Sequence, residues 1–386
     1  MTTVAYFGVP SDLRPRHIYV HVPFCARRCS YCDFSIAVRR NVPVDEYVNA
    51  VASELSLRSP GDMPWPIDTL YFGGGTPSRL GGSGVAKLLD VFRRRVQLTG
   101  GEEITLETNP EDVSLDSIRA WRDAGVNRLS LGSQSFDDDV LKWMHRTHDA
   151  SAIARAVDAA RTVGIDNISL DLIFALPERN ARSWENDVTR ALELEPSHLS
   201  LYGLTIEPHT PLGRWRARGD VVESPEERYE AEFLYAHDAL TAAGLEHYEV
   251  SNFGRPGRRS RHNSSYWTGA AYAGLGPSAH EFDGAVRRWN VAPYAEWLER
   301  LDAGADPIDE QEQLTAENRV AEQVYLGLRT TGGLLLGDGE LPHIQSWISQ
   351  GWAKLVGENH RLVLTPLGWL RLDALAADLT LRRSRY

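Results

Sequence analysis

The chain has 386 residues, of which 42% are hydrophobic, and its formal net charge is −12. This length and apolar content allow one large α/β domain and a smaller one, and the negative charge argues against non-specific binding to nucleic acid. No apolar run reaches membrane-spanning length and no signal peptide is recognisable, so we expect a cytoplasmic protein. All three cysteines lie between positions 25 and 32, which argues against a disulfide framework and fits a reducing compartment.

Short β-branched runs alternate with amphipathic helical patterns in the first half of the chain. We predict strands at 18–24, 69–72, 103–107, 128–131, 168–174 and 199–204. The helical patterns between them cover 44–57, 115–124, 151–163 and 184–194. Six βα-like units at roughly 30-residue spacing predict a parallel sheet with right-handed crossovers. Six units are too few for a closed eight-stranded barrel, so we predict a partial (β/α)6 barrel over 17–223, preceded by an N-terminal arm at 1–16.

A different pattern begins near residue 224. The region 224–313 is expected to connect two domains; it has a helical pattern at 225–240, a strand and turn near 248–253, and a glycine-rich stretch at 269–280. It also holds a cluster of four arginines, namely Arg255, Arg258, Arg259 and Arg261. The remaining segment, 314–386, combines a helix–turn–helix-like pattern with a strand and a last helix, which predicts a small α+β module resembling a winged helix. It lacks a basic helix face, so we do not expect it to bind DNA.

The most specific motif is the cysteine triplet Cys25, Cys29 and Cys32, spaced C-x3-C-x2-C after an apolar strand. Three thiolates hold three irons of a [4Fe–4S] cluster and leave the fourth iron open. S-adenosylmethionine (SAM) can chelate such an iron through its amino and carboxylate groups. Two alternatives stay open at this point: a zinc ion bound by His21 and the three cysteines, and three cysteines that merely pack in the core.

Polar and glycine residues recur where the predicted strands end. Gly73–Pro77 follows the second strand, Glu107 ends the third, Gln134 follows the fourth and Asp171 lies in the fifth. Chemistry in parallel α/β sheets gathers at the carboxyl ends of the strands, so we expect these residues to converge. The glycines allow a ligand to approach the backbone, and the two carboxylates suit amino or hydroxyl groups of a ligand. A tight turn and salt bridges to arginines are the structural alternatives.

Together these motifs resemble the oxygen-independent coproporphyrinogen III oxidase branch of the radical-SAM superfamily. The similar blocks are Tyr19–Cys25, Gly73–Pro77, Glu107, Ser133–Phe136, Arg146 and Leu170–Ile173. The resemblance implies that Cys25, Cys29 and Cys32 hold the cluster. It also implies that SAM contacts Tyr19, Gly74, Gly75, Thr76, Glu107, Gln134, Arg146 and Asp171. One departure precedes Arg146, where Met144-His145 replaces the usual Leu-Gly.

Two functions occur in that branch, and three features favour the heme chaperones over the decarboxylating oxidases. The oxidases have a fourth cysteine where this chain has Phe34, and a long extension ahead of the first cysteine. The heme chaperones have an H-N-x-x-Y-W motif, which is intact here from His262 to Trp267. The resemblance therefore implies a protein that binds heme and delivers it to acceptor apo-hemoproteins of the respiratory chain, some of them in the membrane. The oxidase activity remains the alternative, and no catalytic residue is predicted.

The heme motif suits a porphyrin chemically. His262 and Tyr266 are four residues apart and share a face if the motif is helical. His262 is the expected axial ligand, Tyr266 or Trp267 would stack on the macrocycle, and the arginine cluster would bind the propionates. A hydrogen-bonded packing histidine and a solvated arginine run are the structural alternatives. His280 is a second ligand candidate, although we expect its loop, 274–280, to close over SAM. The sequence leaves open whether the chain forms a homodimer.

Overall fold

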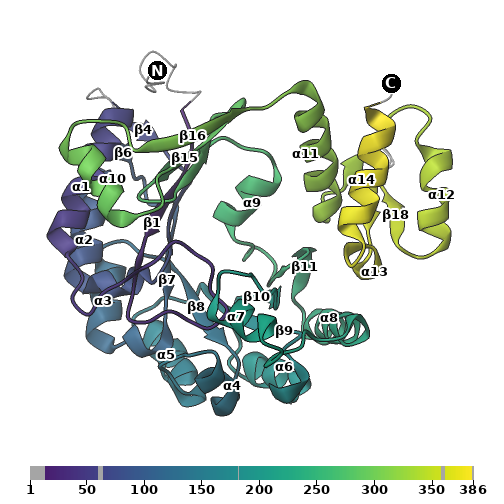
Figure 1. Cartoon of the computed structure of the whole chain (residues 1–386), viewed down its shortest axis with the longest axis horizontal. Coiled ribbons are helices and arrows are strands. Elements are labelled where there is room, and N and C mark those ends of the chain that lie inside the picture. Colours follow the sequence, from purple (N-terminus) through teal and green to yellow (C-terminus); the bar gives the residue numbers. More distant parts are fainter. Residues whose placement is uncertain (1–13, 60–63, 181, 358–360, 385–386) are drawn as a thin grey trace.

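The computed structural model describes residues 14–59, 64–180, 182–357 and 361–384, and a twelve-stranded sheet forms its centre (Figure 1). Neighbouring parallel strands of this sheet match the six predicted ones. They are β1 (His17–Val22), β5 (Thr69–Gly74), β7 (Glu103–Thr108), β8 (Arg128–Gln134), β9 (Ile168–Phe174) and β10 (His198–Gly203). The predicted α/β partial barrel is confirmed. The predicted arm lies almost wholly outside the described residues.

Helices follow the parallel strands and cover the outer face of the curved sheet (Figure 1). They are α1 (Val44–Arg58), α2 (Gly81–Arg93), α3 (Leu115–Asp123), α4 (Asp138–Trp143), α5 (Ala150–Thr162) and α6 (Trp184–Glu193). Several begin where a side chain accepts a hydrogen bond from the first turn, as Ser114, Asp149 and Ser183 do. Their apolar sides bury Trp121 and Trp184 completely against the sheet. The sheet is thereby held firmly from outside, and its strand ends are left to build a site.

The region predicted as a connection supplies strands at both edges of the sheet. The hairpin β11 (Glu246–Glu249) and β12 (Asn252–Gly254) lies beside β10. At the other edge β13 (Tyr272–Leu275) pairs in parallel with β1, followed by the antiparallel strands β14 (His280–Phe282), β15 (Val286–Asn290) and β16 (Ile308–Gln313). The prediction of a loop over 274–280 was therefore wrong for its strand residues. The strand was difficult to predict because it contains Gly274, and glycine is unfavourable in strands. Glycine is needed there, since a Cβ would lie 2.0 Å from the backbone oxygen of His280.

A buried ion network anchors this edge of the sheet to α1. The Arg58 guanidinium lies 2.9 Å from Glu54 and 2.8 Å from Glu281, and it donates a 2.6 Å hydrogen bond to the carbonyl of Gly274. Arg288 donates to Glu281 from the neighbouring strand. Removing one partner of such a buried pair typically costs about 3–5 kcal/mol, because the other charge is left buried and unpaired. The positions of β13, β14 and β15 are thus fixed relative to the barrel.

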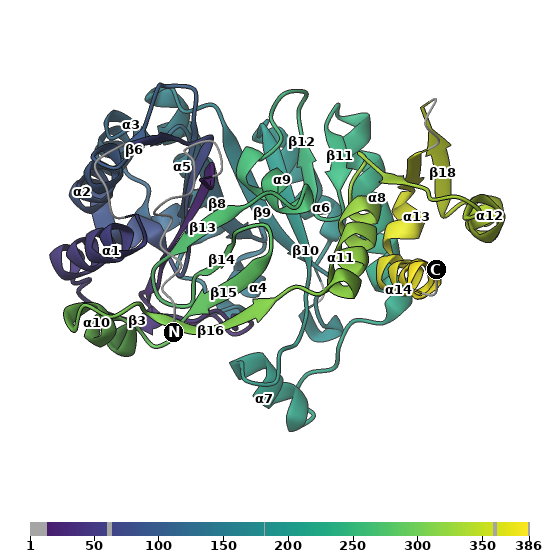
Figure 2. The same ribbon diagram turned by 90° about the horizontal axis from the view of Figure 1, so that it is seen from above.

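The C-terminal part packs as a separate group of helices beside the open edge of the barrel (Figure 2). It contains α11 (Ala316–Arg329), α12 (Leu341–Ser349), α13 (Pro366–Trp369) and α14 (Leu372–Arg383), with a small sheet of β17 (Leu334–Leu335), β19 (Arg361–Leu364) and β18 (Ala353–Val356). The domain boundaries themselves stay a prediction. Within the described ranges, no helix is both long and apolar enough to cross a membrane.

Shorter elements complete the chain. The helices are α7 (Pro211–Ala217), α8 (Glu226–Ala242), α9 (Arg261–Trp267) and α10 (Tyr294–Asp302). Two small parallel pairs are β2 (Phe24–Cys25) with β3 (Ala37–Val38) and β4 (Trp65–Pro66) with β6 (Val96–Gln97). Of these elements, α9 bears most directly on function, because it carries the H-N-x-x-Y-W motif on the inner side of the barrel (Figure 1).

Candidate functional site

The three cysteines share one cavity of about 330 Å³ at the carboxyl ends of the parallel strands. Cys25 ends the short strand β2 and is buried, whereas Cys29 and Cys32 lie half-buried in the loop that comes after it. The cavity wall includes every residue predicted to contact the cluster or SAM except Tyr19. These residues are Cys25, Cys29, Cys32, Gly74, Gly75, Thr76, Glu107, Gln134, Arg146 and Asp171. The prediction that the strand-end residues converge is confirmed.

Burial keeps two of the three thiols protonated while no metal is bound. Burial raises the pKa of the Cys32 thiol to about 12, and burial also raises the pKa of Cys25. Buried thiols of this kind become thiolates only beside a positive partner such as a metal. Arg146 lies near, with its Nη1 at 3.6 Å from the Cys29 sulfur, and Thr76 Oγ1 lies 3.4 Å from the Cys25 sulfur.

The arrangement of the donors distinguishes a cluster from a single ion. In the part of the chain that the structure describes, no group of three or more histidine, cysteine or acidic side chains converges as a single-ion site requires. A tetrahedral zinc site needs such convergence, whereas each thiolate of a cluster binds its own iron. His21 is also occupied elsewhere, since its ring contacts Tyr19 at 3.1 Å and the carbonyl of Ser35 at 3.0 Å. The donor set fits an iron–sulfur cluster better than zinc.

The glycine run after β5 is fixed by close packing. A Cβ on Gly74 would lie 2.6 Å from the His21 ring, and one on Gly75 would lie 2.7 Å from the backbone of Pro23. Gly74 also has a φ of 109°, which only glycine adopts freely. Its amide donates a 3.0 Å hydrogen bond to Glu107. The turn therefore serves packing, and both of these glycines also face the cavity.

Two carboxylates, Glu107 and Asp171, stand on the same wall of the cavity. Tyr71 donates a 2.7 Å hydrogen bond to Glu107, and Ser130 donates to Asp171 at 3.0 Å. Burial raises the pKa of Glu107 to about 7, and burial also raises the pKa of Asp171. Neither residue forms an ion pair with any described side chain, and the nearby charge of Arg128 acts on both. A ligand that supplies an ammonium or hydroxyl groups would satisfy both.

The cavity has further polar residues that were not predicted to contact the cluster or SAM. Asn109, Ser130 and Tyr202 line it, and Asn109 accepts a 2.6 Å hydrogen bond from Arg146. Their position in the sequence gave a signal, because polar residues within or directly after buried parallel strands repeat the pattern of Glu107 and Asp171. Gln134 has a φ of 65° at the end of β8, where the pairing with β9 shifts register.

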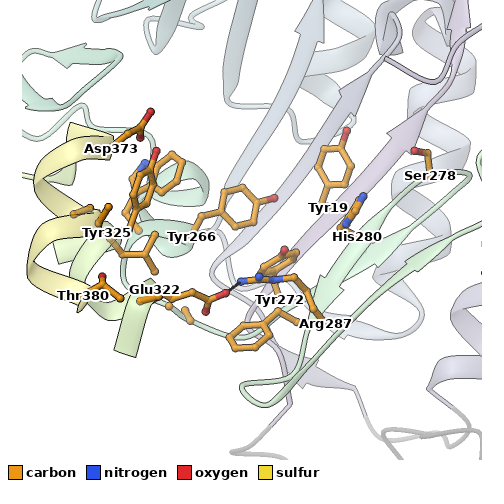
Figure 3. Close-up of a pocket in the computed structure, with 18 of the residues that line it drawn as sticks. Tyr19, Tyr266, Tyr272, Ser278, His280, Arg287, Glu322, Tyr325, Asp373 and Thr380 are labelled. Carbon is orange, nitrogen blue, oxygen red and sulfur yellow. Dashed lines mark ion pairs between the residues drawn. The ribbon is translucent and has the colours of Figure 1, made fainter. Parts of the chain in front are cut away.

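A second and larger cavity, of about 1210 Å³, lies between the barrel edge and the C-terminal helices (Figure 3). Tyr266 and Trp267 of the H-N-x-x-Y-W motif line it, and so does Tyr19, which was predicted to contact SAM. Asp33 and Phe34 line both cavities and mark the place where they meet.

His262 lies behind the wall of this larger cavity and does not line it. Its Nδ1 is 2.7 Å from the Thr69 hydroxyl, its Nε2 is 2.8 Å from the Tyr266 hydroxyl, and its ring stacks on Tyr71 at 4.9 Å. Burial holds the pKa of His262 well below its usual range. Its predicted role as an axial ligand stays a prediction, since ligation would first break one of these hydrogen bonds.

The arginine cluster does not reach either cavity. Arg259 pairs with Glu246 at 2.9 Å, and Arg261 donates to the carbonyl of Gly101 at 2.7 Å. The cation on the wall of the larger cavity is instead Arg287, from a strand that the sequence analysis did not find. The predicted contact between this cluster and the propionates stays a prediction, and neither cavity is lined by these arginines.

Comparison with known proteins places this geometry in a family. The model of the radical SAM superfamily matches residues 19–191. A protein of Mycobacterium tuberculosis called heme chaperone HemW is 36% identical, with 96% of both chains covered. One with the same description from Bacillus subtilis is 34% identical over 82% of this chain and 84% of its own. The chain belongs to the HemW family.

The fold agrees with that assignment. The coproporphyrinogen III oxidase HemN of Escherichia coli, a radical SAM enzyme, superposes with a TM-score of 0.79, covering 94% of this chain and 89% of its own at 24% identity. This likeness concerns the fold. As a radical SAM protein, a HemW family member implies a [4Fe–4S] cluster and SAM. In this chain the three thiols would hold the cluster, and Glu107, Asp171 and the glycine turn would hold SAM.

Proposed function

We propose that this protein is a cytoplasmic heme chaperone, which binds heme and passes it to acceptor apo-hemoproteins of the respiratory chain. The observation that carries the proposal is the larger cavity beside Tyr266 and Trp267. Its volume of about 1210 Å³ exceeds the roughly 300–1,000 Å³ common for small-molecule pockets, so it has room for a tetrapyrrole. The HemW relatives support it, because they are described as heme chaperones.

The motif residues have distinct parts in this proposal. Tyr266 and Trp267 present aromatic surface to the macrocycle, and offset aromatic contacts favour such stacking. Arg329 lies over the Trp267 ring at 4.1 Å and holds that ring in place from the C-terminal side. His262 fixes Tyr266 through the hydrogen bond between them. The motif thus shapes one wall of the heme site.

The smaller cavity has a separate task. Its thiols would hold the cluster, and its carboxylates and glycine turn would bind and orient SAM. When bound, the cluster would supply an open iron that the amino and carboxylate groups of SAM can chelate. Asp33 and Phe34 line both cavities, so the cysteine loop lies where the two sites meet.

The oxidase alternative calls for a different outcome. Phe34, with 60% of its surface exposed, stands where the oxidases have a fourth cysteine, so no described thiol is available at that position. We therefore expect heme to be bound stoichiometrically and coproporphyrinogen III to be left unchanged.

One experiment separates the two functions. The protein is reconstituted anaerobically with iron and sulfide, its iron and labile sulfide are measured, and hemin is added while the Soret band is recorded. We expect about one heme per chain, and no decarboxylated product when SAM, a reductant and coproporphyrinogen III are supplied. A second arm mixes the heme-loaded protein with an apo-cytochrome and follows the transfer of heme. Multiple turnovers to protoporphyrinogen, or an absence of heme binding, would contradict the proposal.

A further inference from the structure

The wall of the larger cavity is built from parts of the chain that are far apart in sequence. Tyr19 comes from β1, His280 from β14 and Arg287 from β15, while Tyr325 and Thr380 face them from α11 and α14 (Figure 3). Leu381, with 55% of its surface exposed, also lines the cavity. Large exposed apolar side chains around a hollow of this size fit a broad, flat and apolar ligand.

Strand geometry decides which side chains of β14 face this cavity. Neighbouring residues of a strand point to opposite faces. Glu281 is buried on the face of the sheet that α1 covers, where it meets Arg58 and Arg288. His280 and Phe282 must therefore point the other way, and both line the cavity. Because the buried ion network fixes Glu281, it also fixes the direction in which the His280 imidazole projects.

The imidazole ring of His280 is held by stacking, and its two nitrogens are available to a ligand. Its ring stacks on Trp289 of the paired strand, with centroids 5.5 Å apart and planes inclined by 25°. Neither ring nitrogen forms a hydrogen bond or ion pair with any residue that the structure describes. His262 differs on both points, since it is buried and both of its nitrogens are engaged.

A cation stands beside His280 on the same face. Arg287 lines the cavity, with its guanidinium over the Phe282 ring at 5.4 Å, and it pairs with Glu322 of α11 at 2.6 Å. Both partners of this pair are about one-third exposed, so the pair is weak and exchangeable. A ligand carboxylate would take the place of Glu322, because a guanidinium binds a carboxylate bidentately.

We propose that His280 is the axial ligand of the heme iron, that Arg287 binds a heme propionate, and that His262 acts only by positioning Tyr266. This inference rests on the proposed function and adds the residues that bind the heme. The lone pair of the neutral imidazole forms the bond to iron, so no oxidant or reductant is needed. Tyr266 and the side chains of α11 and α14 cover the macrocycle from the remaining sides.

The test compares histidine variants of the full-length, cluster-loaded protein in hemin titrations, read by the Soret band and by electron paramagnetic resonance. His280→Ala should weaken hemin binding at least about tenfold. A loss of this size is already typical when a residue that only supports a metal ligand is mutated, and His280 is proposed as the ligand itself. The imidazole-ligand signature should vanish and return when free imidazole is added. His280→Gln, which keeps the size of the side chain, guards against a packing effect. His209→Ala is the matched control, since His209 is exposed and lines neither cavity.

His262→Ala provides the opposing arm. It should retain the imidazole signature, although its affinity falls because Tyr266 loses a hydrogen bond. The ligand assignment is overturned if His280→Ala and His280→Gln keep the signature, or if His262→Ala loses it while the cluster stays intact. If the wild-type protein binds no hemin at all, the proposed function itself fails. This outcome differs from a failure of the ligand assignment alone, in which the wild type binds hemin but the His280 variants keep the signature.

Discussion

The two cavities of this molecule are built in opposite ways. The smaller one collects residues from the ends of consecutive parallel strands, so each contribution sits in a short motif after its own strand. The larger one is assembled from a sheet edge and from two C-terminal helices, which approach from different parts of the chain (Figures 2 and 3). A site of the first kind can be read from sequence motifs, whereas a site of the second kind emerges only from the tertiary arrangement.

The comparison predicts that the two sites can be damaged separately, and the largest effect concerns the cluster. Cys25→Ala should abolish the [4Fe–4S] cluster, because two thiolates cannot hold three of its irons. Iron and labile sulfide analysis with the absorbance near roughly 400 nm would measure the loss.

Heme titration of the same variant sharpens the comparison. Cys25 lines only the smaller cavity, so Cys25→Ala should still bind hemin with nearly unchanged affinity. Ser56→Ala, on the outer helix α1, serves as the control for general damage. An intact cluster in Cys25→Ala would remove this residue from the ligand set. A complete loss of hemin binding in a folded variant would mean that the two cavities are one functional unit.

The next effect in size is the dependence of SAM binding on pH. Burial raises the pKa of Glu107 to about 7, so this carboxyl group is protonated below that pH and ionised above it. An ammonium group of the ligand prefers the ionised form. SAM affinity should therefore increase as the pH rises through about 7, and Glu107→Gln should weaken binding and flatten this dependence.

Stability should change with the opposite sign. The unfolded Glu107 ionises near its ordinary pKa of about 4.3, whereas the folded one does so near 7. The folded state thus binds more protons between these values, and its stability falls as the pH rises through that window. Isothermal titration of SAM from about pH 6 to 8, a window that brackets the raised pKa, measures the trend in affinity. Thermal unfolding of the wild type and of Glu107→Gln at different pH values measures the trend in stability. Equal pH dependence of SAM affinity in wild type and Glu107→Gln would exclude this carboxylate from the site.

Sequence motifs were most informative for the barrel and the smaller cavity. Cys25, Cys29 and Cys32 stand close together in the sequence, and Glu107 and Asp171 interrupt apolar strands, so burial cost alone marked them. The six strands could be predicted from short apolar runs, because parallel strands that are buried on both faces consist mostly of apolar residues. The barrel and most of the smaller cavity were therefore predictable.

The larger cavity was not predictable in the same way. β13 is short and contains Gly274. His280 points into the larger cavity because its neighbour Glu281 points the other way, toward Arg58 of α1. That ion pair joins residues 58 and 281, and nothing in the local pattern indicates it. The motif from His262 to Trp267 was recognised in the sequence. The sequence did not indicate that the His262 side chain contacts Thr69 and lies away from the cavity.

The smallest expected effect lies where the two cavities meet. Phe34 lines both, and 60% of its surface is exposed. Because so much of the ring is already in water, Phe34→Ala should barely change the stability of the protein. In the heme complex the ring would gain a partner, and an aromatic contact contributes about 0.5–1.5 kcal/mol beyond its burial. Hemin affinity should thus fall by roughly two- to tenfold, since about 1.4 kcal/mol corresponds to a factor of ten.

Cluster content and SAM affinity of Phe34→Ala make the comparison decisive. The thiols and carboxylates of the smaller cavity do not depend on this ring, so both quantities should match those of the wild type. Phe34→Leu, which keeps apolar volume without the aromatic face, separates stacking from simple coverage: its hemin affinity should lie between those of the other two. If Phe34→Ala instead lost its cluster while hemin binding stayed the same, the ring would belong to the cysteine loop alone. The two cavities would then meet at Phe34 without sharing it as a functional residue.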